Sequence, residues 1–330
     1  MAGIKKLRKI QMGRETTAGA EVNATTIWRG LGVPEDLQDT QFVEEDVGYL
    51  SGVDRVVIPS VLAGLSMEAT PATFEQLPHI LEAGVKTATP AQDGTGSGYI
   101  YTYTFPTTTQ PTLKTYTLEA GDDQQEEQFT YGFVESFKLS GKSKEPVMMS
   151  AEWRGRQLEI GTYTGSLSLV TVEELLFGKS LLYIDPTTMG TTLKSNTLLA
   201  FDLDVKTGVT PVFAGDGQLY FSFTKTVMPE VVLNITYEHD STSVAEKAAW
   251  RAKTMRLIRL KITGSTFTTA GSAYPAKTVL IDLAGKWEKF DKIGEQDGND
   301  VVQGTFRARY DTTAAKFAEI VVVTNLSALP

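Results

Sequence analysis

Residues 135–141 read Glu-Ser-Phe-Lys-Leu-Ser-Gly, and residues 288–294 read Glu-Lys-Phe-Asp-Lys-Ile-Gly. The same offset of 153 positions, without a gap, places Trp-Arg-Gly-Arg at 153–156 on Phe-Arg-Ala-Arg at 306–309. Internal repeats decide the architecture of a chain, because each copy folds as one structural unit. We therefore predict that the two halves of this sequence hold the same module.

The order of the expected elements supports the duplication. In the first half, strand-like stretches precede a helix that Thr70 and Pro71 open and that Gly84 ends, with a kink expected at Pro78. In the second half, strand-like stretches precede a helix that a capping-box pattern opens at Ser243. Apolar alternation predicts strands at 54–58, 60–67, 99–105, 113–118, 129–139 and 147–153 in the first half, and at 218–226, 231–237, 255–263, 278–283, 287–293, 301–309 and 317–324 in the second.

A weaker match places Leu-Glu-Ala-Gly at 118–121 on Leu-Ala-Gly at 283–285, with an offset of 164–165. The change of offset implies about twelve extra residues in the first half. We place them in the acidic stretch 121–128.

The composition predicts a mainly β fold, and the repeat predicts two related modules with a short helix beside each. The 330 residues include 43 threonines and 29 glycines, and threonine favours strands. At about 100–200 residues per domain, this length fits two modules. We place an N-terminal segment at 1–45, read as an extended arm or a meander of short strands, the first module at 46–170 and the second, duplicated module at 171–330.

The formal net charge is −9. An acidic surface does not hold nucleic acid by counterion release, but nucleic acid can pass along it without sticking. The basic start of the chain lacks the apolar stretch of a secretory signal, and no run approaches the roughly 18 apolar residues of a membrane span. We therefore expect no membrane partner.

No catalytic constellation stands out in the sequence. It has no cysteine and only two histidines, His79 and His239, which leaves no thiol nucleophile and no cluster of histidine ligands. The glycines of 93–98 precede a strand instead of opening a helix, so this stretch is not a dinucleotide-binding loop. The acidic stretch lacks the spacing of a calcium loop. We expect no enzyme activity, no cofactor and no metal site.

Long loops that do not pack on their own module suit contacts between subunits. We expect such contacts in an acidic group of the arm, in the glycine-rich loop 92–98 and in the acidic stretch, with a basic row of the second half as their partner. The candidate residues are Glu44, Glu45, Asp46, Asp93, Gly94, Gly96, Gly98, Asp122, Asp123, Glu126, Glu127, Arg256, Arg259 and Lys261.

Several stretches of the first half resemble tail tube proteins of long-tailed phages. They are Pro34–Leu37, Phe42–Leu50, Ala69–Pro78, Thr115–Asp123 and Val147–Arg156. The resemblance covers about residues 10–160, and the second half shares it through its likeness to the first.

The resemblance implies a structural virion protein, made in the host cytoplasm. It implies two related β-sandwich or barrel-forming modules, each with a short flanking helix, that join so that their sheets form one barrel around a channel. Six modules usually close a ring, so chains of two modules imply trimeric, pseudo-hexameric rings, whereas chains of one module imply six. Stacked rings then form the conduit for DNA ejection. The implied partners are further copies of the chain, the tape measure, tail terminator and distal tail proteins, and double-stranded DNA that passes without specific binding.

A different class stays open: a β-sandwich module that binds glycans or a host surface, or that decorates a virion. Such a module needs an exposed aromatic platform, and the four tryptophans, at 28, 153, 250 and 287, are scattered instead. Assembly discriminates between the two classes, because a tube protein forms rings or tubes and a binding module stays discrete.

Overall fold

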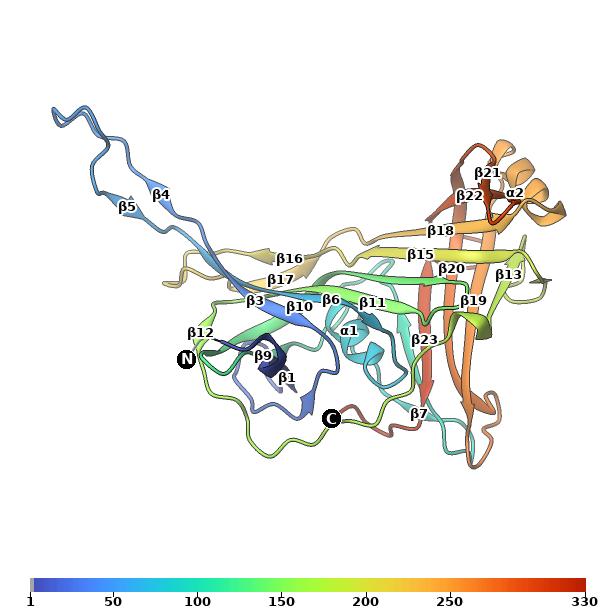
Figure 1. Cartoon of the computed structure of the whole chain (residues 1–330), viewed down its shortest axis with the longest axis horizontal. Coiled ribbons are helices and arrows are strands. Elements are labelled where there is room, and N and C mark those ends of the chain that lie inside the picture. Colours follow the sequence, from blue (N-terminus) through green and yellow to red (C-terminus); the bar gives the residue numbers. More distant parts are fainter. Residues whose placement is uncertain (1–2) are drawn as a thin grey trace.

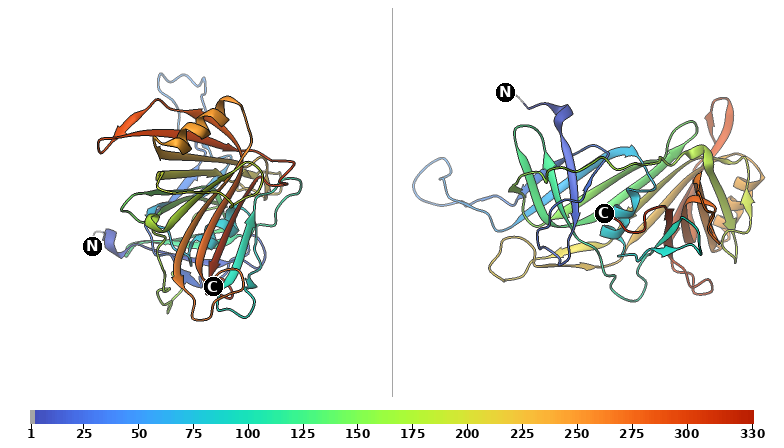
Figure 2. Two further views of the ribbon diagram at one scale, coloured as in Figure 1. Left: turned by 90° about the vertical axis from the view of Figure 1, so that its right-hand side faces the viewer. Right: turned by 90° about the horizontal axis from the view of Figure 1, so that it is seen from below.

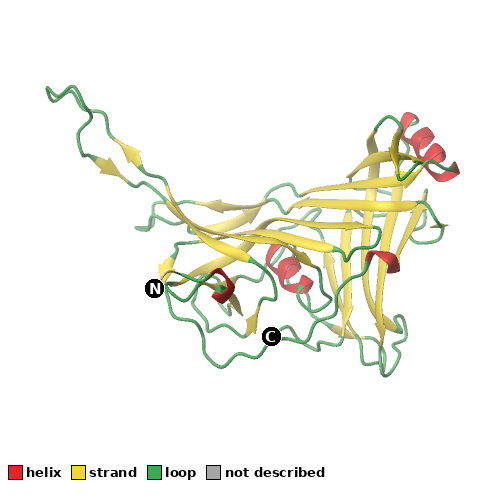
Figure 3. Cartoon of the chain, in the orientation of Figure 1, coloured by secondary structure: helices red, strands yellow, loops and turns green. Residues whose placement is uncertain are grey.

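Antiparallel strands form most of the chain, as the sequence predicts. The computed structural model describes residues 3–330, and strands hold 48% of the chain against 8% in helices. Figure 3 shows these strands gathered in one body, with a hairpin that projects from it. The mainly β fold is therefore confirmed.

Eight antiparallel strands pair side by side in one continuous row. Most of them run along the length of the molecule (Figure 1). In order, the row contains β3 (Gly32–Gln38), β6 (Val61–Pro71), β11 (Met148–Gly155), the second half of β10 (Glu126–Lys142), β15 (Leu198–Lys206), β18 (Glu230–Glu238), β22 (Asn299–Ala308) and the second half of β20 (Ala276–Phe290). Along β11, β18 and β22, buried and more exposed residues alternate, so one face packs on the core. We call the opposite, outward side the polar face.

β10 and β20 each extend from this row into a second sheet, and Figure 2 shows the strands around β20 crossing the row. The sheet of the first half contains β2 (Thr26–Ile27), β1 (Lys9–Arg14), β9 (Tyr116–Gly121), the start of β10 and β12 (Glu159–Ile160). The sheet of the second half contains β14 (Leu193–Lys194), β13 (Ser180–Asp185), β19 (Arg256–Thr266), the start of β20, β23 (Ala318–Thr324), β8 (Tyr99–Thr104) and β7 (Ala91–Gln92). The remaining elements are the hairpins β4–β5 (Gln41–Phe42, Val56–Val57) and β16–β17 (Val209–Val212, Phe223–Thr226), β21 (Gly294–Gln296), and the short helices η1 (Lys5–Leu7) and η2 (Phe177–Lys179).

The two halves repeat this arrangement strand for strand. β1, β2 and β3 correspond to β13, β14 and β15, while β6, β9, β10 and β11 correspond to β18, β19, β20 and β22. Residues 9–38 therefore belong to the first module, as short strands and not as the extended arm that was one of the two expectations for 1–45. The reason is that β1 pairs along its whole length with β9 and buries Ile10 and Met12.

The offset of 153 positions also holds in the strand register. Val134 lies opposite Trp153, and Trp287 lies opposite Phe306 at the corresponding place in the second half. All four side chains are buried, and a β-bulge follows directly in each strand pair. The tryptophan thus stays in the same cross-strand pair although it changes strand.

The bulge repeats an ion pair as well. Arg154 Nε lies 2.9 Å from Glu135 Oε2, and Arg307 Nε lies 2.7 Å from Glu288 Oε2. A bulge leaves one residue without a partner across the strand pair, and in both halves that residue is the glutamate. Element order, register and side-chain pairing together support the predicted duplication.

The weaker sequence match is wrong. Residues 118–121 end β9, whereas residues 283–285 lie inside β20, the counterpart of β10. The extra residues of the first half lie at 85–115, where β8 crosses over to pair with β23 and β7 pairs with β8, while only 252–255 separate the second helix from β19. The two modules consequently share one sheet and one hydrophobic core.

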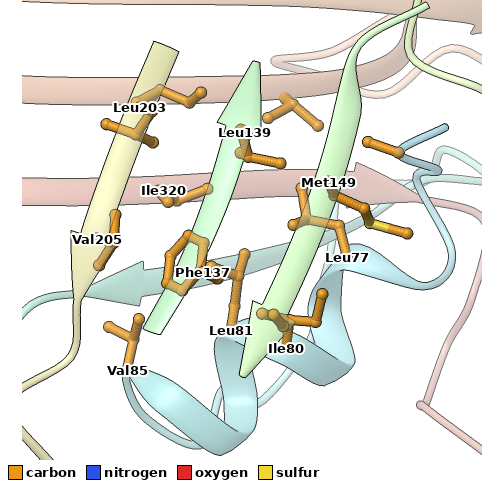
Figure 4. Close-up of a cluster of buried hydrophobic side chains, with 14 of the residues drawn as sticks. Leu77, Ile80, Leu81, Val85, Phe137, Leu139, Met149, Leu203, Val205 and Ile320 are labelled. Atoms are coloured by element: carbon orange, nitrogen blue, oxygen red, sulfur yellow. The ribbon is translucent and has the colours of Figure 1, made fainter. Parts of the chain in front are cut away.

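α1 (Leu77–Gly84) begins later than the sequence predicts, because Thr70 and Pro71 continue strand β6. Pro78 lies in the first turn of α1, where its missing N–H breaks no helical hydrogen bond. Every residue of α1 is buried. Figure 4 shows its apolar side chains against those of β10, β11 and β15, so α1 fills the space beneath the junction of the two modules.

α2 (Ser241–Arg251) begins two residues before the predicted cap. Asp240 is its N-cap, because Asp240 Oδ1 accepts a hydrogen bond from Ser243 N at 3.0 Å and Ser243 Oγ accepts one from Asp240 N at 3.1 Å. Only Ser243, Glu246 and Ala249 of α2 are buried, and Val244 is exposed. α2 therefore lies on the surface of the second module, whereas α1 is covered.

Candidate assembly surface

Ion pairs cross the polar face and engage several of its basic side chains. Lys138 Nζ lies 2.8 Å from Asp204 Oδ1, and Lys206 Nζ lies 3.3 Å from Glu230 Oε2. Arg307 also reaches Glu230, and hydrogen bonds from Arg307 and Lys206 hold the pKa of Glu230 below its usual range. The face is thus mixed in sign, and these cations are already paired with carboxylates.

The row of eight strands has an internal seam, the ladder between β10 and β15, where the modules meet. The offset of 153 positions takes the seam residues 136–142 of β10 to 289–295, which hold the end of β20 and the start of β21, and β3 corresponds to β15. Within residues 3–330, neither of these two edges has a ladder partner on its outer side. The two ends of the strand row are therefore the counterparts of the two strands that pair at the internal seam. Unpaired strand edges can pair with a strand of another copy.

The expected acidic contacts Glu44, Glu45 and Asp46 lie in the loop of the β4–β5 hairpin, which projects from the body (Figure 1). Glu45 Oε1 accepts a hydrogen bond from Arg55 Nη1 at 2.7 Å. Glu44 and Asp46 are exposed, and no cation of the described chain pairs with them. The structure thus keeps two carboxylates available near the tip of the hairpin.

The glycine-rich loop 92–98 packs on its own chain and does not reach outward. The Asp93 carboxylate is buried and accepts hydrogen bonds of 2.7–3.1 Å from the backbone N–H groups of residues 273–274. Gly96 lies so close to Gly271 that a Cβ on it would overlap the backbone there. The loop that we expected at a subunit contact is held by the turn between β19 and β20.

The acidic stretch is a tight turn and not a long loop. Asp122 Oδ1 accepts a hydrogen bond of 2.9 Å from the backbone two residues onward. Asp123 Oδ1 accepts one of 2.8 Å from Ile4 N, which lowers the pKa of Asp123. Glu126 and Glu127 already lie in β10. The stretch therefore ties the start of the chain to the first module.

Two of the three side chains of the basic row on β19 are engaged within the second module. Arg256 Nε lies 3.0 Å from Glu246 Oε2, and Arg259 makes two hydrogen bonds of 2.6 and 2.7 Å to the buried Asp282. Lys261 shares their strand. Within one chain the structure does not bring this row to the β4–β5 hairpin, which lies at the opposite end of the molecule (Figure 1).

A buried polar cluster around α1 is not among the residues expected from the sequence. Arg14 Nη2 lies 2.8 Å from Glu82 Oε1, and the Tyr116 hydroxyl donates to Glu82 Oε2 at 3.0 Å. His79 Nδ1 lies 3.0 Å from that hydroxyl and must donate to it, because the single hydroxyl proton is directed at Glu82. Burial, with the Arg14 cation nearby, lowers the pKa of His79 to about 3. The sequence signal for this cluster is Glu82, a carboxylate within the apolar helix α1.

No family model and no curated protein sequence matches this chain. Within residues 3–330, neither helix has the length and apolar character needed to span a membrane. The same residues hold no group of three acidic or histidine side chains placed to bind a metal ion. The fold and its surface define a two-module, mainly β chain whose two open edges match its own internal seam.

Proposed function

We propose that this chain is the subunit of a phage tail tube, a structural virion protein that polymerises into stacked rings around a channel for DNA ejection. The sequence resemblance, the duplicated modules and the open edges support this proposal together. The proposal assigns the chain no reaction and no cofactor. The chain is made in the host cytoplasm, resides in the tail of the virion, and contacts the tape measure, tail terminator and distal tail proteins.

The observation that carries the proposal is the match between the internal seam and the open edges. β10 and β15 pair within the chain, and their counterparts β20 and β3 are free on their outer sides. Pairing β20 of one copy with β3 of the next continues the row, and closing the row removes every lateral edge. Three copies supply six modules and complete a trimeric, pseudo-hexameric ring.

The internal seam also predicts which residues meet between copies. Lys138 lies opposite Asp204 in the seam and forms an ion pair with it. The corresponding positions at the open edges are Asp291 and Glu35. The seam between copies therefore places two carboxylates opposite each other, and it lacks the ion pair of the internal seam.

The polar face suits the wall of a DNA channel. DNA carries one negative charge per about 1.7 Å of its axis, and free cations on the wall would hold it by counterion release. Most basic side chains on the strands of this face are paired with carboxylates, and the whole chain carries a net charge of −9. Lys286, which lies opposite Arg307, has no such partner among residues 3–330. A wall of this kind lets DNA slide past without specific binding.

Negative-stain electron microscopy of the concentrated protein, with rotational averaging of end-on views, tests the proposal. We expect hollow rings or tubes with three strong and three weak lobes. Six equal lobes, each with the mass of a whole chain, would keep the tube and overturn the trimer. Compact monomers at every concentration would contradict the tube and favour a discrete β-sandwich binding or decoration module.

A further inference from the structure

The hairpins β4–β5 and β16–β17 are counterparts in the two modules. β4–β5 connects β3 to β6, and β16–β17 connects β15 to β18. Their registers agree as well: Phe42 pairs with Val56, and the corresponding residues Pro211 and Thr224 pair in the second hairpin. The two hairpins differ in their surroundings, because β16–β17 packs on the body and β4–β5 projects from it (Figure 1).

The β16–β17 hairpin is anchored on the first module by a phenylalanine and an arginine. Phe221 is fully buried, and its ring centroid lies 5.0 Å from that of Tyr131 and 5.8 Å from that of Phe133. The Arg156 guanidinium lies 4.8 Å from the Tyr131 ring and 5.1 Å from the ring of Tyr220 in the hairpin. It also donates to the hairpin backbone at 3.1 Å. The anchor site thus combines an apolar floor with a cation.

The second module has a groove at the corresponding place. The offset of 153 positions takes Phe133 to Lys286 and Arg156 to Arg309, and both of these basic residues line a groove of about 600 Å³. The lining also includes Pro186, Met255, Tyr310 and Asp311, whose carboxylate is engaged by the backbone of residues 313–314. Within residues 3–330, neither Lys286 nor Arg309 has a carboxylate at ion-pair distance.

The β4–β5 hairpin carries the groups that complement this groove. Phe42, Tyr49 and Leu50 are 74%, 76% and 110% exposed, so large apolar side chains cluster in water on one hairpin. Exposed apolar clusters of this kind mark interaction sites. Glu44 and Asp46 lie among them and are opposite in sign to the two cations of the groove.

We infer that the β4–β5 hairpin of one copy docks in this groove of the neighbouring copy, as β16–β17 docks on the first module of its own chain. The two carboxylates of the hairpin then face the two cations, and its apolar tip covers the apolar part of the lining. β16–β17 follows β15, which pairs with β10 at the internal seam. Its counterpart β4–β5 follows β3, so it makes its contact beside the seam between copies. The inference rests on the proposed assembly and names one of its contacts.

A charge swap tests the contact. We expect the double variant Lys286→Glu, Arg309→Glu to need about tenfold more protein for ring formation, because two attractive contacts become repulsive. Adding Glu44→Lys and Asp46→Lys to the same chain restores opposite signs and is expected to restore assembly. Lys179→Glu reverses an exposed charge elsewhere and serves as the control. A quadruple variant that stays as defective as the double variant would overturn the inference.

Cysteine pairs distinguish this inference from the proposed function, because the chain has no cysteine of its own. Leu50→Cys combined with Tyr310→Cys is expected to give covalent trimers with a bis-maleimide linker, and neither single variant is expected to do so. Glu35→Cys combined with Asp291→Cys reports the strand seam between copies. Cross-linking of the seam pair alone would overturn the hairpin contact and keep the ring. Failure of both pairs would overturn the ring itself.

Discussion

Glu135 and Glu288 occupy the same bulge in the two modules, and each binds an arginine of the next strand. A bulged residue is aimed differently from its neighbours, so a side-chain contact there depends on the local twist. Exposed ion pairs of this kind contribute only about 0–1 kcal/mol each. Their repetition therefore indicates a shared backbone geometry and not a large stabilisation.

The buried His79 predicts a pH dependence of stability. Its pKa is about 3 in the folded chain and about 6.5 in an unfolded one. Because the unfolded state binds this proton more readily, the free energy of unfolding falls as the pH falls from about 6.5 toward 3. At pH 4 we expect His79 to account for a loss of about 3 kcal/mol. Urea unfolding at pH 7, 5.5 and 4 measures it.

The variant His79→Asn isolates this contribution, since asparagine offers a donor near the position of Nδ1 and does not titrate. Both proteins keep the same carboxylates, so the difference between their pH profiles belongs to the histidine. We expect the variant to have the flatter profile between pH 6.5 and 4. Identical slopes would show that the folded chain accepts the proton at this site.

Strands with one buried face could be predicted from sequence, and β8, β11, β18 and β22 fall close to their expected positions. β3 could not, because its sequence is polar and contains Pro34, which is tolerated at a sheet edge and resembles a loop. The start of α1 was misplaced for another reason: Thr70 pairs with Met149 in the ladder, and this strand pairing overrides its local preference to cap a helix.

The two hairpins predict opposite responses to the same kind of truncation. Phe221→Ala removes the buried anchor of β16–β17 and is expected to lower the free energy of unfolding of the free chain by about 3–5 kcal/mol. Leu50→Ala, in the counterpart hairpin, is expected to change it by less than about 0.5 kcal/mol, because that side chain is exposed. Leu50→Ala should instead weaken ring formation. Similar losses of stability in both variants would show that β4–β5 packs on its own chain.

Opposed carboxylates at the seam between copies predict a variant that assembles more readily. Asp291→Lys recreates the lysine–carboxylate pair of the internal seam and removes a like-charge contact, which is worth about 0.2–1 kcal/mol. We expect ring formation at a lower protein concentration, measured by light scattering or sedimentation. Glu159→Lys makes the same change of net charge at an exposed site in β12 and is the control. An equal effect of both variants would assign the gain to net charge alone.

At the scale of the molecule, the duplication could be predicted because the matching stretches contain the repeated bulge and its buried cross-strand pair. The subunit contacts could not be assigned in the same way. Asp93 is bound by residues 273–274 and Asp123 by Ile4, and these partners lie far along the chain, where no local pattern reveals them. Among the expected acidic contacts, Glu44 and Asp46 of the β4–β5 hairpin are exposed and have no ion-pair partner within residues 3–330.

The helices α1 and α2 occupy corresponding positions in the two modules, but they differ in burial and polarity. α1 lies beneath the internal seam and is apolar and fully buried, whereas α2 lies on the surface of the second module and is mostly polar. In a ring, α2 takes the place beneath the seam between copies that α1 takes within the chain. Its polar surface keeps the free subunit compatible with water before assembly.

The central claim is that the chain repeats its internal seam between copies, so that three copies close a ring. Native mass spectrometry of isolated rings tests this claim most directly. We expect a ring with three times the chain mass of 36.0 kDa. Rings of six chains would contradict it. So would single chains as the only species released from a sample that has formed tubes.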